Sequence, residues 1–307
     1  MGSLRPGSML VSVINWNNSS ATNACLLSIA GIAKQDQPDV YLIDNDSKRE
    51  ALTLKEDSTK NIRSLMVIHN DHNKGFAGGH NDAIRYAREN GYEYICLLNN
   101  DTQIVDPSVF KKLEAALSAD DTAVAAAPTI LSTLEPPIIW FAGGDMDMPK
   151  ASTQHKRVGE LLADNDSKNI EKVSFLTGCC LMISLKKAPA DALLSEDYFL
   201  YWEDADWCAR MLKNSLNLLY VPDARLLHYT SSSLGVRSPQ YGYYNVRNRL
   251  LFAQKWSAKS VLFSCMWTGV KIVGLSLKRP LGTPKTFWYI VRALIDGQRG
   301  KTGAFDS

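Results

Sequence analysis

The first half of the chain alternates short apolar runs with segments of helical pattern, and this alternation limits the fold more than any other feature. It is typical of a mostly parallel sheet whose strands are joined by crossover helices. We expect strands at residues 10–14, 40–43, 65–68, 94–98 and 123–126. Helices are expected over about 19–34 and 79–89, and a third begins near residue 106. Because ligands of open α/β sheets bind beyond the carboxyl ends of the strands, the residues after these runs are the candidates for a site.

The second half is less regular. From about Thr129 to Asn169 the periodicity disappears, and Pro136-Pro137 and Gly143-Gly144 predict a long irregular segment that is mobile or faces a substrate. Strand-like runs return at 173–176 and 218–221, and residues 203–214 have a helical pattern. After Tyr241 the pattern is helical to the end.

Composition is that of a globular chain, with 45% hydrophobic and 21% charged residues among 307. No apolar stretch reaches the roughly 18 residues that cross a bilayer. Residues 1–9 carry one arginine and no apolar core, so we expect a remnant of cloning rather than a signal peptide. The six cysteines show no metal-finger spacing and lie mostly in apolar runs, which predicts reduced thiols in the core and a cytoplasmic protein.

The charge is unevenly distributed. Residues 247–301 hold eleven lysines and arginines but one acid, Asp296, although the whole chain has a net charge of +2. The same stretch is rich in Trp and Phe, which is unusual for a solvated face.

Polar or glycine-rich segments follow three of the expected strands. Asp44 opens the segment D-N-D-S, where a carboxylate could accept a hydrogen bond from a pyrimidine ring N–H, although an ordinary turn has the same residues. The loop N-K-G-F-A-G-G-H-N, residues 73–81, brings glycines close to a helix start, which suits either a phosphate or close helix packing. Asp101, after Asn99 and Asn100, could be the single carboxylate that a hard divalent cation takes from a protein, or part of a turn.

The strongest local signal is Y-F-L-Y-W-E-D-A-D-W-C-A-R, residues 198–210. Glu203, Asp204 and Asp206 stand among five aromatic residues, and burying three acids together is costly unless a cation or a hydroxyl compensates. A carboxylate with a raised pKa would suit a general base, whereas acids at a helix N-terminus are the structural alternative. Further on, His228 is either a structural histidine or a ligand, and Arg247 either binds a diphosphate or belongs to a basic helix face.

In this order, the segments resemble the inverting glycosyltransferases of family 2, which have the GT-A fold, and particularly their bacterial rhamnosyltransferase-like branch. The resemblance covers roughly Val11 to Phe252. It rests on eight segments: V-S-V-I-N-W, D-N-D-S, N-K-G-F-A-G-G-H-N, L-L-N-N-D-T, T-G-C-C-L-M, Y-F-L-Y-W-E-D-A-D-W-C-A-R, Y-V-P-D-A-R-L-L-H and Y-Y-N-V-R-N-R. One departure is Ser215, where relatives often have glycine, so we expect a different turn after the helix at 203–214.

The resemblance implies an α/β, Rossmann-like catalytic domain over residues 10–252, with a nucleotide-binding half at 10–128 and an acceptor and catalytic half at 129–252. Residues 253–307 would be a basic, aromatic, helical extension. Asp204, with Glu203, takes the position of the general base, and Asp101 with His228 would hold Mg²⁺ or Mn²⁺. The donor would be bound by Asn15, Asp44, Gly75, Asn81, Asn99, Asn100 and Arg247, and the acceptor by Trp202 and Asp206.

The resemblance further implies transfer of a sugar, with L-rhamnose from dTDP-L-rhamnose favoured, to a glycan or a polyprenyl-diphosphate-linked saccharide in bacterial surface polysaccharide synthesis. Alternatives are a UDP-sugar transferase of the galactosyl, galactofuranosyl or GlcNAc type, and a degenerate nucleotide- or glycan-binding module. A sugar-phosphate nucleotidyltransferase is disfavoured, because Asn15-Trp16-Asn17-Asn18-Ser19 is not a glycine-rich, lysine-bearing loop.

The resemblance implies work at the inner face of the cell membrane, and the basic, aromatic tail would then associate with its anionic surface. The alternatives for the tail are a helical pair packed on the catalytic domain and a homodimer interface. Nucleic acid is not expected as a partner, because the aromatic residues lie in apolar helical runs.

Overall fold

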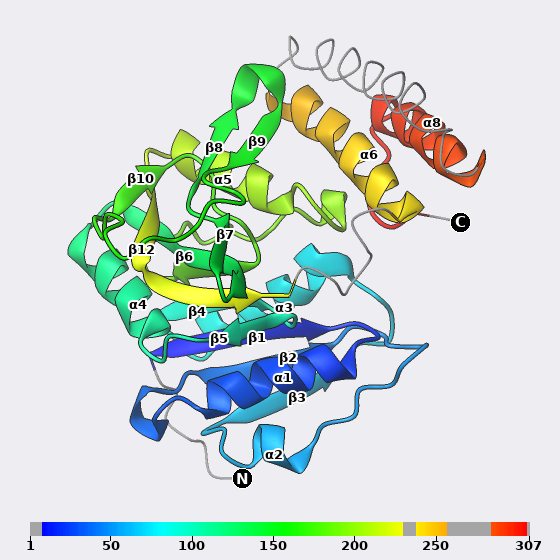
Figure 1. Ribbon diagram of the computed structural model, residues 1–307. Helices are drawn as coiled ribbons and strands as arrows, with labels where there is room; N and C mark the ends of the chain where they lie inside the picture. Colours follow the sequence, from blue (N-terminus) through cyan, green and yellow to red (C-terminus); the bar gives the residue numbers. More distant parts are fainter. Residues whose placement is uncertain (1–7, 230–237, 257–283, 306–307) are drawn as a thin grey trace.

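The computed structural model describes residues 8–229, 238–256 and 284–305 (Figure 1). Within these residues, ten strands form one mixed, mostly parallel sheet. They are β1 (Met9–Asn15), β2 (Asp39–Asp44), β3 (Leu65–His69), β4 (Tyr94–Asn99), β5 (Thr102–Ile104), β6 (Ala123–Leu134), β7 (Pro137–Phe141), β10 (Glu171–Val173), β11 (Cys180–Ser184) and β12 (Asn217–His228). A separate hairpin consists of β8 (Gly144–Asp147) and β9 (Ser152–His155).

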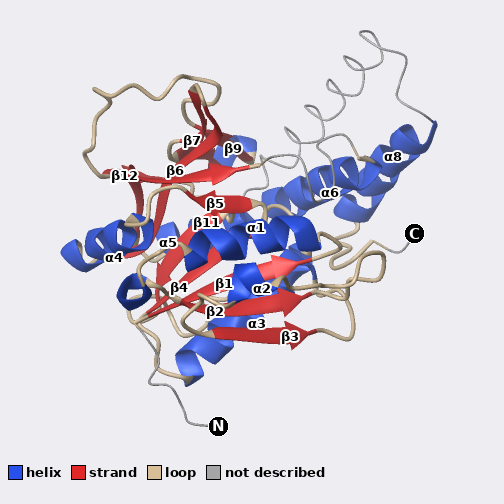
Figure 2. Cartoon of the chain, turned by 60° about the horizontal axis from the view of Figure 1, so that its bottom comes forward, coloured by secondary structure: helices blue, strands red, loops and turns tan. Residues whose placement is uncertain are grey.

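The helices are α1 (Ser19–Ala30), α2 (Glu56–Thr59), α3 (Gly75–Glu89), α4 (Val109–Ala119), α5 (Glu203–Lys213), α6 (Pro239–Trp256) and α8 (Pro284–Gln298). Short 3-10 turns are η1 (Lys34–Asp36), η2 (Met148–Lys150) and η3 (Glu196–Tyr198). Seen from two sides, α1 and α3 lie on opposite faces of the sheet (Figures 1 and 2). This arrangement buries both faces of the central strands, which explains their continuous apolar runs.

The strand order is β10-β12-β6-β11-β4-β1-β2-β3. Strands β3, β2, β1 and β4 are parallel, and β11 is antiparallel to both β4 and β6. Since β1 lies between β2 and β4, the chain changes direction across the sheet at β1. A crevice opens at such a point, beyond the carboxyl ends of β1 and β4.

The expectation of an irregular segment from 129 to 169 is wrong. Strand β6 continues to Leu134, and β7, β8 and β9 follow within that range. The edges of β6 pair with β7, β11 and β12, and these partners are distant or poorly patterned in the sequence. The strand expected at 173–176 is also displaced, because β10 ends at Val173 and the central strand is β11 at 180–184.

Several boundaries move by a few residues. Helix α3 begins at Gly75 rather than near Gly79. Strand β1 already includes Met9, the last of the nine residues expected to be a remnant of cloning. The expected domain boundary at residue 252 falls inside α6. Ser215 has a φ of 59°, the left-handed conformation that glycine favours.

Helices α6 and α8 lie side by side (Figure 1). Gln254 of α6 donates to the carbonyl of Gly297, and the Tyr243 hydroxyl donates to Asp296 over 2.8 Å. The described ends of the tail therefore pack on each other, whereas residues 257–283, the middle of the expected membrane-binding tail, lie outside the described residues.

The cysteines of the described residues, Cys25, Cys96, Cys179, Cys180 and Cys208, are free and buried, as expected of core thiols; Cys265 lies outside this part of the chain. A search of the same residues finds no helix with the length and hydropathy that a membrane span requires.

Candidate active site

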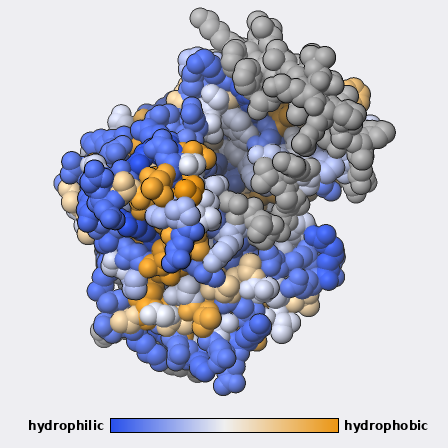
Figure 3. Space-filling model, in the orientation of Figure 1, coloured by the Kyte–Doolittle hydropathy of each residue, from blue (hydrophilic) through white to orange (hydrophobic). Residues whose placement is uncertain are grey.

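A cleft of about 1450 Å³ opens beyond the carboxyl ends of β1 and β4. Ligand sites usually occupy about 300–1,000 Å³, so this cleft has room for two substrates. One side is formed by strand ends and the start of α3, and the other by β9, α5 and α6. The face of the molecule shown in Figure 3 is mostly hydrophilic, with apolar side chains gathered in a band over the region of β7 and β5.

Strand pairing brings Asp101 and His228 together in this cleft. Residue 228 at the end of β12 pairs with Thr102 at the start of β5, so the imidazole Nε2 of His228 lies 3.1 Å from the Asp101 carboxylate. Burial lowers the pKa of His228, but Cys179 and Asp101 outweigh it and raise the pKa to about 10. Because burial also raises the pKa of the Cys179 thiol, the anion that faces His228 at neutral pH is Asp101.

Glu203 and Asp204 occupy the first turn of α5. The Asp204 carboxylate accepts hydrogen bonds from the backbone N–H of Gly178, over 3.0 Å, and of Ala205, over 2.8 Å. Glu203 is buried, and its Oε2 has no hydrogen-bond partner among the described residues.

The two carboxyl groups differ in charge. Burial and the neighbouring Asp204 raise the pKa of Glu203 well above its ordinary value. Burial also raises the pKa of Asp204, but its backbone donors lower it in part. Of the two groups, Glu203 therefore holds a proton more readily, and a single negative charge on the pair is favoured on Asp204, which is partly exposed to the cleft.

The loop before α5 has an unusual backbone. Phe199, Tyr201 and Trp202 have φ angles of 62°, 67° and 80°, a region that costs non-glycine residues roughly 1–3 kcal/mol each. Gly75 accommodates this loop, because a Cβ atom at residue 75 would lie 2.3 Å from the carbonyl oxygen of Phe199. The loop places Trp202 at the cleft, next to Glu203 and Asp204.

The donor side of the cleft contains residues that the sequence predicted and one that it missed. Gly75, Asn99 and Asn100 line the cleft as expected. Asn45 lines it as well, and its side chain donates to Gly75 O over 3.0 Å, which connects the end of β2 to the start of α3. The sequence contains this asparagine in D-N-D-S, where the prediction of a donor contact fell on its neighbour Asp44.

Two residues that were predicted to bind the nucleotide-sugar donor lie beside the cleft rather than in its lining. Asn15 donates to the carboxylate of Asp44 over 2.9 Å, and both side chains are buried. Their chain neighbours Ile14, Trp16 and Asn45 form the lining instead.

Three other predicted residues are not brought to the cleft, because each side chain is buried in packing contacts. Arg247 donates to the carbonyls of Tyr198 and Gly303, not to a position where a diphosphate could bind. Asn81 donates to Leu194 O. Asp206 accepts from Arg210, Lys255 and Trp256 and is fully buried, so it cannot contact an acceptor in this structure.

Sequence patterns missed part of the cleft wall. Trp140 of β7 packs its ring edgewise against His228, with ring centroids 4.6 Å apart, and also lines the cleft. His80 of α3 lies deeper; its Nδ1 is 2.8 Å from Ser12 Oγ, and burial lowers its pKa to about 3, so the ring is neutral. Trp140 stands in no distinctive local pattern, whereas His80 belongs to the segment N-K-G-F-A-G-G-H-N, in which the glycines and Asn81 were the predicted site residues.

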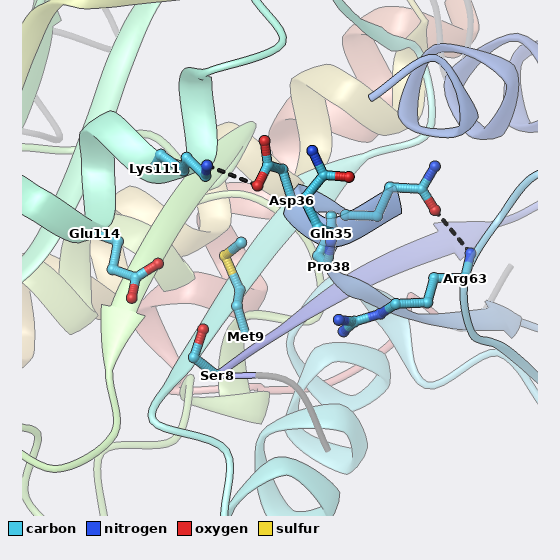
Figure 4. A pocket seen from close by; sticks show the side chains of 9 residues that line it. Ser8, Met9, Gln35, Asp36, Pro38, Arg63, Lys111 and Glu114 are labelled. Carbon is cyan, nitrogen blue, oxygen red and sulfur yellow. Dashed lines mark hydrogen bonds and ion pairs between the residues drawn. The ribbon is translucent and has the colours of Figure 1, made fainter. Parts of the chain in front are cut away.

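A second hollow, of about 110 Å³, lies at the opposite ends of β1 and β2 (Figure 4). Three of its charged groups already have ion-pair partners: Lys111 lies 2.6 Å from Asp36, and the guanidinium of Arg63 lies 2.7 Å from Asp39. Its small size and paired charges make it a poorer candidate site than the cleft.

Comparisons with known proteins show the family of this chain. A family model described as "Glycosyl transferase family 2" matches residues 11–186. The chain is 24% identical over 278 residues to the dTDP-rhamnosyl transferase RfbF of Shigella flexneri, covering 86% of this chain and 87% of that protein.

Solved structures show the same fold. GalNAc-T7 with UDP, GalNAc and Mn²⁺ superposes with a TM-score of 0.62 at 15% identity, over 99% of this chain and 55% of that one. The mannosyltransferase PcManGT from Pyrobaculum calidifontis with GDP-Man and Mn²⁺ superposes with a TM-score of 0.55 at 11% identity, over 96% and 88%. The α/β fold with a GT-A-like sheet, expected from the sequence, is confirmed.

Proposed function

Because this chain belongs to glycosyl transferase family 2, and is thus a glycosyltransferase, we propose that it transfers a sugar from a nucleotide-diphospho-sugar to an acceptor hydroxyl with inversion of the anomeric configuration. The observation that carries this proposal is the position of Asp204. Its carboxylate is held by the N–H of Gly178, faces the cleft, and carries the negative charge of the Glu203–Asp204 pair.

Asp204 acts as the general base. It takes the proton of the acceptor hydroxyl while that oxygen attacks the anomeric carbon and the bond to the diphosphate breaks. Attack from the face opposite the leaving group gives the inverted product in one displacement. Protonated Glu203 leaves Asp204 without a second negative charge beside it, so the base keeps its charge in a buried setting.

The side chains of the cleft fit a divalent cation that is bound partly by the protein and partly by the phosphates of the substrate. Within the described residues, no group of three or more His, Cys, Asp and Glu side chains is placed to hold a metal ion by itself. Mg²⁺ and Mn²⁺ are commonly bound by one or two protein groups together with substrate phosphates, and Asp101 and His228 are such a pair. When bound, the ion would offset the negative charge of the leaving diphosphate.

His228 must lose its proton before its nitrogen can bind a cation. Without a cation, the protonated ring is held by its ion pair with Asp101, 3.1 Å away. Trp16, Asn45 and Gly75 border the nucleotide end of the cleft.

The favoured donor is dTDP-L-rhamnose, which rests on the similarity to the dTDP-rhamnosyl transferase RfbF over most of both chains. A UDP-sugar is the second candidate, and the likeness to GalNAc-T7 with UDP supports it at the level of the fold. The acceptor is a saccharide of a bacterial surface polysaccharide, free or linked to a polyprenyl diphosphate. Trp202 and Tyr241, which line the cleft near Asp204, offer ring faces to such a sugar.

We also propose that the protein associates peripherally with the inner face of the cell membrane. Helix α8 exposes three large apolar side chains, Phe287, Trp288 and Ile295. Arg292 and Arg299 lie on the same helix or directly after it and would attract anionic lipid. Alternatively, a second copy of the chain binds to the exposed side of α8 in a homodimer.

The first experiment is a calorimetric titration of the full chain with dTDP, UDP, GDP and ADP, each with and without Mn²⁺. We expect Mn²⁺-dependent binding of dTDP, with UDP weaker. Transfer from dTDP-L-rhamnose to a panel of saccharide acceptors is then followed by NMR of the anomeric proton. Tighter binding of UDP than of dTDP would replace dTDP-L-rhamnose by a UDP-sugar as the proposed donor. A product with retained anomeric configuration would contradict the proposed single displacement. A folded chain that binds none of the four nucleotides would favour a degenerate binding module.

A further inference from the structure

The strained loop from Tyr198 to Trp202 needs an external support. Phe199, Tyr201 and Trp202 are aromatic residues in the left-handed region of φ, and such a conformation persists only when surrounding contacts hold it. The loop runs directly into the first turn of α5. Its backbone therefore determines where Glu203 and Asp204 stand.

Helix α6 supplies this support through one side chain. The amide nitrogen of Asn248 lies 2.9 Å from Tyr198 O, 2.8 Å from Leu200 O and 2.8 Å from Tyr201 O. An amide nitrogen has two hydrogens, so one of them is shared between two carbonyls. Asn248 is completely buried, and an unmet carbonyl there would be costly.

Arg247 fixes the orientation of that amide. Its Nε donates to Asn248 Oδ1 over 2.8 Å, which turns the amide nitrogen toward the loop. One terminal nitrogen of Arg247 also donates to Tyr198 O over 2.9 Å, and the other donates to Gly303 O over 2.6 Å. The guanidinium lies over the rings of Tyr243 and Tyr244, at 5.4 Å and 5.1 Å from their centroids.

The opposite side of the loop rests on α3. The backbone N–H of Phe76 donates to Phe199 O over 2.8 Å, so the carbonyls of residues 198 to 201 all accept a hydrogen bond. Gly75 lies so close that any side chain there would displace Phe199. The loop is thus held between the donor side of the cleft and helix α6.

We infer that Arg247 and Asn248 are positioning residues, which hold the 198–202 loop in its strained conformation and so place Asp204 for proton transfer. The inference rests on the proposed role of Asp204. It gives the R-N pair of the segment Y-Y-N-V-R-N-R a role in the reaction without any contact with the diphosphate.

The test variant is Asn248→Asp, which keeps the volume and the contact with Arg247 but replaces the donating nitrogen with an oxygen. Three carbonyls then face an acceptor, so the loop should leave its strained conformation. Asn248→Ser removes the same donors without introducing repulsion and serves if the aspartate variant does not fold. Gln254→Ala is the matched control, because this α6 residue also donates to two carbonyls, those of Gly297 and Gln298, but not to the loop.

Hydrogen exchange followed by mass spectrometry reads the loop directly and needs no substrate. In Asn248→Asp, we expect the amides of Phe76 and of residues 200–206 to exchange at least tenfold faster, with other core peptides unchanged. The Gln254→Ala control should exchange like the unmodified chain in this region. A folded Asn248 variant with unchanged exchange in residues 200–206 would overturn the inference.

Kinetics separate positioning from general stability. With dTDP-L-rhamnose, we expect kcat of the Asn248 variant to fall at least 30-fold while the donor KM changes less than threefold. Combined with Asp204→Asn, it should reduce kcat no further than Asp204→Asn alone, because it acts through that carboxylate. If the two substitutions reduce kcat by the product of their single effects, Asn248 does not act through Asp204. If the unmodified chain does not use dTDP-L-rhamnose, the donor proposal fails, but the exchange result still decides on the loop.

Discussion

The carboxylate of Asp101 lies 3.1 Å from Nε2 of His228, although the two residues are far apart in the sequence. The contact exists because β5 pairs antiparallel with the end of β12, opposite the ends of β1 and β4. It brings an anion and a cation together in the cleft, and it is the basis of the first prediction.

Asp101→Asn should abolish the effect of Mn²⁺ on nucleotide binding. We expect Mn²⁺ to strengthen dTDP binding to the unmodified chain at least tenfold, and less than twofold in the variant, because the amide brings no negative charge to the ion. Isothermal titration measures both values. Asp36→Asn, in the small hollow at the other end of the sheet (Figure 4), is the control and should behave like the unmodified chain. An Asp101 variant with intact Mn²⁺ dependence would place the metal elsewhere.

Asp204→Asn should reduce kcat by about 10³ or more, since the amide cannot accept the proton. This corresponds to about 4 kcal/mol of transition-state stabilisation. Donor affinity should remain, because the side chain keeps its size and the substitution leaves Asp101 and His228 unchanged. Steady-state kinetics measure the loss of kcat, and titration with dTDP measures whether donor affinity is unchanged. Asp197→Asn, an exposed residue on η3, is the control. Near-normal turnover of Asp204→Asn would remove the residue from the role of base.

Glu203→Gln should retain activity within about threefold of the unmodified chain. A protonated glutamate and a glutamine are both neutral and have nearly the same shape, and burial beside Asp204 keeps Glu203 protonated. Turnover under saturating donor measures the effect. A loss as large as that of Asp204→Asn would mean that the charge of Glu203 is required, and would contradict the assignment of the negative charge to Asp204.

The pH dependence of kcat should show an acid limb above the range of an ordinary aspartate. Burial raises the pKa of Asp204 from its usual 3.8, and a general base works only when ionised, so the rate is lost as pH falls through this raised pKa. Glu203→Gln should leave the limb in place, because Glu203 is already uncharged there. An inflection at or below the ordinary value would contradict the raised pKa.

Replacing Phe287 and Trp288 with serine should weaken membrane binding. We expect the unmodified chain to co-sediment with vesicles that contain phosphatidylglycerol, and the double variant to lose at least tenfold in affinity, because both side chains are about half exposed on α8. Thermal unfolding should change little, since neither side chain is buried. Vesicle binding that is unaffected by the two substitutions would favour the alternative of a dimer interface, which sedimentation velocity would reveal.

The amino-terminal half of the fold followed from its sequence because its strands are buried on both faces and separated by single helices. Such runs are apolar throughout and can be recognised locally. The start of β6 was predicted at residues 123–126, but its continuation to Leu134 and strands β7 to β9 were missed. Their pairing is decided by distant segments, because β6 lies between β11 and β12, and the sequence around residues 129–169 shows neither of these partners.

The site divides in the same way. From the order of its segments and their resemblance to the family, the sequence predicted that the ends of β4 and β12 and the first turn of α5 belong to one site, and Asp101, His228, Glu203 and Asp204 do line one cleft. Only the tertiary structure decided which charged side chains reach it. Arg247 and Asp206 have the chemistry of binding residues, but their charges are satisfied by carbonyls and by Lys255 within the core. Burial and partner geometry, which arise from contacts between remote segments, separate a group that binds a substrate from one that holds the fold.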